Sequence, residues 1–178
     1  HLCDRRQRQM CIRDRHAHGI DPHIWTSPRA LKQMAANAYD ALRTSFPDSV
    51  RYTENYEKLL VRLDSLDTAC AEALRQADVH TIVIYHPALT YYAADYGLEQ
   101  LAVEHDGKEP SARHLARLIE EARRKKVRRV FYQAQYPAST VKVIAEDIGA
   151  RSVKIDPLRE DVIENIGEIT RQLTSGNE

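Results

Sequence analysis

The feature of this chain that most constrains its fold is a change of hydrophobic periodicity after Asp78. Up to that residue, the apolar side chains recur with the three- and four-residue spacing of helices. After it, short β-prone runs alternate with helical segments, the runs covering residues 81–85, 99–104, 127–132 and 151–155. Such alternation is typical of parallel strands joined by crossover helices. The sequence therefore predicts an α/β fold with a four-stranded parallel sheet.

Two long helices are expected before the sheet. An apolar face predicts a helix over residues 28–46, with Ser27 as its N-cap and Pro28 at its first position. A nearly unbroken apolar stripe predicts a second helix over residues 49–77, roughly 40 Å long. Shorter helices are expected over residues 111–126, 137–148 and 161–173.

Length and charge narrow the classes of protein to which the chain can belong. Its 178 residues suit one domain, or one domain and a piece of another. The 26 basic residues balance 26 acidic ones, so no overall field favours nucleic acid or an anionic membrane. No apolar run approaches the roughly 20 residues that span a bilayer. The basic run at residues 123–129 is interpreted as a solvated helix end, where cations complement the helix dipole.

The cysteines do not predict a zinc site or a disulfide framework. Cys3, Cys11 and Cys70 are odd in number and lack the spacing of zinc ligands. Cys70 lies on an apolar helical stripe and is expected in the core. Residues 1–15 resemble the translation of an adapter used in sequencing libraries, and we treat them as non-native.

Three side chains far apart in the sequence predict a metal site. His23 lies in a proline-bounded turn before a long helix, while His86 and Asp156 each follow a strand-like run directly. Residues after parallel strands share one edge of the sheet, so His86 and Asp156 should lie at one mouth, together with Gln133 and the turn at residues 104–106. Two imidazoles and a carboxylate suit zinc and can suit manganese. The plainer alternatives are structural histidines and an Asp-Pro turn.

Two other functions remain open at this point. A metal-dependent hydrolase could use the same ligands with Glu104 or Glu109 as the general base, although no recognisable catalytic motif is present. An interaction module without metal could use the basic run to bind a polyanion. His105 is expected to be a surface residue, and His16 and His18 are weak evidence for metal binding.

Five segments together resemble the zinc and manganese solute-binding proteins of ABC importers. They are DPHIWTSP at residues 21–28, YHPALTYY at 85–92, EHDGKEPS at 104–111, VFYQAQ at 130–135 and KIDPL at 154–158. They occur in the family's order, and the resemblance spans residues 19–173. Each motif is weak alone, but the set is specific.

The resemblance implies a fold of two α/β lobes joined by a long helix, with the metal clamped between the lobes. Residues 16–27 would then end an N-terminal lobe that is missing here, residues 28–48 would form the inter-lobe helix, and residues 49–178 would form the C-terminal lobe. The missing lobe supplies another histidine in the family. This chain would therefore hold at most three of four expected ligands.

The resemblance also implies a function and a ligand set. His23, His86 and Asp156 match the family's metal ligands, and histidine at position 86 resembles the zinc-type members. The expected protein is not an enzyme: it captures zinc, with manganese as the alternative, outside the cytoplasmic membrane and passes it to a permease. We expect a monomer that does not bind nucleic acid and reaches the membrane only through the permease or a lost N-terminal anchor. Gln133 departs from the glutamate that is frequent in the family.

Overall fold

The computed structural model describes residues 21–104, 109–136 and 138–175, and it confirms the predicted α/β fold. Four parallel strands form one sheet in the order β2-β1-β3-β4. Their bounds are Thr81–Ile84 for β1, Glu99–Ala102 for β2, Arg129–Gln133 for β3 and Arg151–Ile155 for β4. The predicted non-native segment, the two cysteines within it, His16, His18 and His105 lie outside the described residues.

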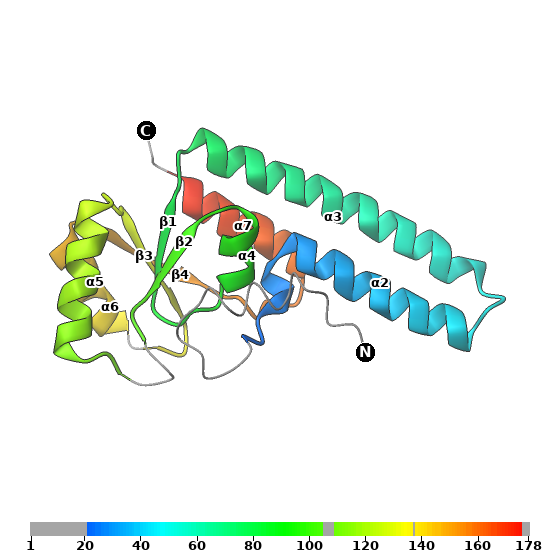
Figure 1. Ribbon diagram of the computed structural model, residues 1–178, viewed down its shortest axis with the longest axis horizontal. Coiled ribbons are helices and arrows are strands. Elements are labelled where there is room, and N and C mark those ends of the chain that lie inside the picture. Colours follow the sequence, from blue (N-terminus) through cyan, green and yellow to red (C-terminus); the bar gives the residue numbers. More distant parts are fainter. Residues whose placement is uncertain (1–20, 105–108, 137, 176–178) are drawn as a thin grey trace.

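Helices cover both faces of the sheet (Figure 1). On one face lie α3 (Val50–Gln76), α4 (Thr90–Asp95) and α7 (Val162–Thr174); on the other lie α5 (Ala112–Arg124) and α6 (Ala138–Ile148). Strands β1 and β3 therefore send alternate side chains into two separate cores. One core contains Cys70, Ile82, Ile84, Tyr92, Phe131, Ile166 and Ile169, and the other contains Val83, Val103, Leu118, Val130, Val141 and Ile144.

The helix pair before the sheet consists of α2 (Pro28–Ser45) and α3, which lie side by side and extend away from the sheet (Figure 1). Ser27 caps α2 as predicted, because its hydroxyl accepts a hydrogen bond from the backbone N–H of Ala30 at 3.0 Å. The rings of Tyr39 and Tyr56 stack between the helices with centroids 4.3 Å apart. No helix within the described ranges is both long and apolar enough to cross a bilayer.

Strand β1 ends one residue before the prediction, and the boundaries of β2 and β3 differ by up to two residues for physical reasons. Strand β3 begins two residues late because Val127 belongs to the cap of α5: its N–H donates to the carbonyl of Ala122, and Lys126 has a positive φ of 54°. This is the hydrogen-bond pattern of a Schellman motif. Strand β2 ends at Ala102, but its backbone pairing with the first strand continues, since Glu104 N–H donates to the carbonyl of Tyr85 at 2.8 Å.

The order of the strands places a topological switch point beside β1. The chain passes from β1 to β2 through α4 on one face, then returns to β3 through α5 on the other face, so β1 and β3 are neighbours. In open α/β sheets, ligands bind outside the carboxyl ends of the strands at such a switch point. His86 and Gln133, which follow or end these two strands, lie there.

Candidate metal centre

His86 is held at the switch point through its own backbone. Its carbonyl accepts hydrogen bonds from the side-chain Nε2 of Gln133 at 2.9 Å and from the N–H of Ala88 at 2.8 Å. Gln133 is almost fully buried, with 1% of its surface exposed. A carboxylate at position 133 would set two acceptors against each other, so the amide explains why this chain carries glutamine where the resemblance leads one to expect glutamate.

The imidazole of His86 is oriented by a buried carboxylate. Its Nδ1 lies 3.2 and 3.1 Å from the two side-chain oxygens of Glu104, whose side chain is only 6% exposed. The ring of Tyr136 lies against His86 with centroids 5.5 Å apart. Burial raises the pKa of the Tyr136 hydroxyl, and the Glu104 carboxylate raises it further. The Tyr136 hydroxyl therefore stays protonated and neutral beside the Glu104 carboxylate.

His23 is oriented in the same way by Asp21. Its backbone N–H and its Nδ1 both donate to one oxygen of the Asp21 carboxylate, at 2.9 and 2.6 Å. Burial raises the pKa of the Asp21 carboxyl group, but its hydrogen bonds, chiefly from His23, outweigh burial, so this pKa lies below its ordinary value of 3.8. Tyr91 fixes the turn by donating its hydroxyl to the carbonyl of Asp21 at 2.9 Å. His23 then leads into a short 3-10 helix, η1 (Ile24–Thr26).

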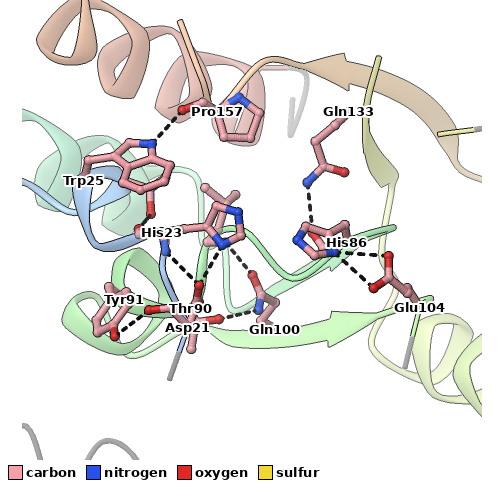
Figure 2. Close-up of polar contacts among 12 residues, drawn as sticks. Asp21, His23, Trp25, His86, Thr90, Tyr91, Gln100, Glu104, Gln133 and Pro157 are labelled. Atoms are coloured by element: carbon pink, nitrogen blue, oxygen red, sulfur yellow. Dashed lines mark hydrogen bonds and ion pairs between the residues drawn. The ribbon is translucent and has the colours of Figure 1, made fainter. Parts of the chain in front are cut away.

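The two imidazoles meet although 63 positions separate them in the sequence. The ring centroids of His23 and His86 are 5.2 Å apart, with an angle of 74° between the ring planes. Figure 2 shows each ring with its Nδ1 turned to a carboxylate and its other nitrogen toward the neighbouring ring. Within the described residues, neither Nε2 atom has a hydrogen-bond partner.

This spacing suits a shared zinc ion. Zinc binds imidazole nitrogen at about 2.0–2.1 Å with tetrahedral angles, which would place the centroids of two bound rings roughly 5 Å apart. An imidazole whose Nδ1 donates to a carboxylate carries its free lone pair on Nε2, the atom that then binds metal. The pair therefore has both the spacing and the tautomers of a metal-binding unit.

Asp156 does not join the histidines in one ligand cluster. It follows β4 at the same edge of the sheet, as expected, but its side chain is exposed and one oxygen accepts a hydrogen bond from the N–H of Leu158 at 3.0 Å. Across the described part of the chain, no group of three or more His, Cys, Asp or Glu side chains lies close enough to hold a metal. Its role as a ligand stays a prediction.

Several contacts of this centre were not expected from the sequence. Asp21 had no assigned role, although an Asp two residues before a histidine can form such a turn. Glu104, considered as a base, instead orients His86. Trp25 reaches the turn after β4, where its indole N–H donates to the carbonyl of Pro157 at 2.9 Å (Figure 2).

The basic run serves the fold at the end of α5. Arg123 donates to the carbonyl of Asp147, and Lys125 forms an ion pair with Glu99. Arg129 donates to the carbonyl of Leu173 at 2.8 Å. These contacts agree with the interpretation as a helix end.

Comparison with known proteins identifies the family. The family model described as "ZnuA: Zinc-uptake complex component A periplasmic" matches residues 6–174. The chain belongs to the ZnuA family. This is a family of zinc-binding transport components and not of enzymes, so the hydrolase alternative has no support in the comparisons.

Individual ZnuA relatives agree in sequence. The zinc-binding lipoprotein AdcA of Streptococcus pneumoniae R6 is 32% identical over 146 residues, which cover 80% of this chain and 29% of AdcA. The high-affinity zinc uptake system protein ZnuA of Bacillus subtilis is 27% identical over 145 residues, which cover 80% of this chain and 46% of that protein. The chain thus spans less than half the length of these two relatives.

Solved structures agree in fold. A crystal structure of ZnuA superposes with a TM-score of 0.83 and 31% identity, covering 89% of this chain and 62% of that one. The periplasmic zinc-binding protein TroA of Treponema pallidum has the same fold, with a TM-score of 0.76 at 16% identity, over 96% of this chain and 70% of that one.

Proposed function

We propose that the protein containing this chain captures zinc outside the cytoplasmic membrane and delivers it to the permease of an ABC importer. The observation that carries this proposal is the pair of imidazoles, His23 and His86, whose free nitrogens face a shared space at a spacing suited to zinc. Membership in a zinc-uptake family supports zinc as the substrate. The transport protein holds and releases the ion, and no bond is broken.

The proposed ligands are Nε2 of His23, Nε2 of His86 and one carboxylate oxygen of Asp156. Asp156 Oδ1 is engaged by a backbone N–H, while its other oxygen has no partner among the described residues. Two neutral nitrogens favour zinc over manganese, because manganese prefers carboxylate, carbonyl and water oxygens. A further ligand would come from an N-terminal lobe, as the family resemblance implies.

The larger assembly follows from the same proposal. In a two-lobe protein, residues 28–48 would form the inter-lobe helix, and residues 49–178 would form the lobe that carries His86 and Asp156. The relatives are described as a periplasmic component and as lipoproteins, which supports a place outside the cytoplasmic membrane. We propose that the protein acts as a monomer, with the permease as its partner.

Replacing His86 tests the proposal. The His86→Ala variant loses one of two nitrogen donors, so we expect its zinc affinity, measured by calorimetric titration of the chain, to fall by about 100-fold. His80→Ala is the matched control, because His80 is exposed and precedes β1 at the opposite end of the strand. Equal zinc affinity in all three proteins would remove His86 from the site and overturn the proposal.

A further inference from the structure

A hydrogen bond joins the turn that carries His23 to the turn that carries Asp156. The indole N–H of Trp25 donates to the carbonyl of Pro157 at 2.9 Å, across 132 positions of sequence. Trp25 lies in η1, two residues after His23, and the two rings are in edge contact with centroids 5.4 Å apart. Pro157, directly after Asp156, is buried although its neighbours on both sides are exposed. The contact therefore ties the Asp156 turn to the histidine turn at a buried point.

A buried side chain provides a second anchor for the turn. Asn165, which is 5% exposed at the start of α7, donates its Nδ2 to the carbonyl of Asp156 at 2.8 Å. The N–H groups of Leu158 and Arg159 donate to Asp156 itself, and the exposed Arg159 side chain pairs with Glu164 of α7 at 2.9 Å. Internal bonds shape a turn but do not place it relative to other elements. Asn165 and Trp25 therefore contribute to the placement of Asp156 together with the exposed Arg159–Glu164 pair.

These two anchors constrain Asp156 in different directions. Asn165 attaches the turn to α7, which packs on one face of the sheet, whereas Trp25 attaches it to η1 and hence to His23. The Trp25 contact joins the turn of the carboxylate directly to the turn that carries His23. A ligand that must lie within a few tenths of an ångström of its binding position depends on such supporting contacts.

We propose that Trp25 is a positioning residue: its indole N–H keeps the Asp156 turn beside the turn that carries His23, from which the carboxylate can approach the ion bound by His23 and His86. The inference rests on the proposed function, since it assumes that the three residues bind one zinc ion. Trp25 itself does not touch the metal. Its effect on metal affinity passes through Asp156.

A double-mutant cycle tests this route. Trp25→Phe retains an aromatic ring beside His23 but removes the N–H donor, and Asp156→Asn weakens the proposed oxygen ligand. We expect each single variant of the full 178-residue chain to bind zinc about tenfold more weakly in competition with a chromophoric chelator. The double variant should bind no more weakly than Asp156→Asn, within about twofold, because coupled residues are not additive.

Two further variants guard against a purely structural effect. Tyr39→Phe removes a hydroxyl that bonds Thr53 between α2 and α3, and it should leave zinc affinity unchanged. Asn165→Ser removes the other anchor of the turn and should show the same dependence on Asp156 as Trp25→Phe. If Trp25→Phe does not fold by circular dichroism, replacement of Trp25 by benzothienylalanine carries the test, because sulfur takes the place of the N–H in a ring of nearly the same shape.

The outcomes separate the two proposals. If Trp25→Phe still weakens binding tenfold in the Asp156→Asn background, Trp25 acts through His23 or the fold, and the inference is overturned. If Asp156→Asn alone leaves the affinity unchanged, the inference is also overturned, while a loss of affinity in His86→Ala keeps the capture function standing. If His86→Ala is unchanged as well, both proposals fail.

Discussion

At the scale of single residues, the centre consists of two histidines, each of which forms a hydrogen bond with a carboxylate through Nδ1. Asp21 accepts from Nδ1 of His23 at 2.6 Å, and Glu104 accepts from Nδ1 of His86 at 3.1 Å. A carboxylate at Nδ1 fixes both the tautomer and the direction of the ring. In each histidine, Nε2 is therefore the nitrogen available to a metal, and its direction is fixed before the metal binds.

Glu104→Gln should weaken zinc binding without removing a ligand. An amide can accept from Nδ1 or donate to it, so it no longer selects the tautomer with a free Nε2. We expect the zinc affinity of the chain to fall about tenfold in chelator competition. Glu109→Gln, at an exposed position in the same segment, is the matched control. Equal affinities in the two variants would contradict this role for Glu104.

Sequence reasoning found the histidines but not what supports them. A histidine directly after a strand and another in a proline-bounded turn can be read from the chain, because strand ends of a parallel sheet share one edge. The partner of an imidazole depends on side-chain direction at ångström scale, which no spacing reveals. Glu104 was thus considered as a base, and its contact with His86 follows only from pairing that continues past β2.

At the scale of elements, α7 stabilises the sheet by filling the core beneath it. Ile169 is 2% exposed and packs in the cluster that also contains Tyr92 and Phe131. Truncation there would leave a cavity that the surrounding helices and strands cannot fill.

Ile169→Ala should therefore lower the free energy of unfolding by about 2–5 kcal/mol, as buried isoleucine truncations do. The matched control is Val143→Ala, since Val143 on α6 is 59% exposed and its truncation should change stability by less than about 0.5 kcal/mol. Urea unfolding of both variants measures the difference. A similar loss in the two would mean that α7 does not pack as described.

Periodicity predicted the long elements and missed the short ones. The apolar stripes of α2, α3 and α7 run for three or more turns, so their helical spacing can be recognised in the sequence. Strand β4 has the predicted bounds. Helix α4 has six residues and η1 has three, which is too short for a period to be recognised. Helix α4 nevertheless contributes to the core, since Tyr92 is fully buried.

At the scale of the whole molecule, the topology brings side chains that are far apart in the sequence to the same edge of the sheet. The reversal of strand order places His86 at the switch point beside β1, and α2 starts directly after η1, which follows His23. Figure 1 shows α2 leaving the sheet from this end. The edge shared by His86 and Asp156 could be predicted from parallel strands alone. The 5.2 Å separation of the imidazoles could not, because it depends on how η1 packs against the α/β unit.

The central claim, that His23 and His86 share one cation, is tested most directly by X-ray absorption at the zinc edge. Fine structure from the chain loaded with one equivalent of zinc counts bound imidazoles through their nitrogens at about 2.0–2.1 Å and their outer ring atoms. The account predicts two imidazoles in the parent chain and one in either His23→Ala or His86→Ala. A count that stays the same in both variants would contradict it.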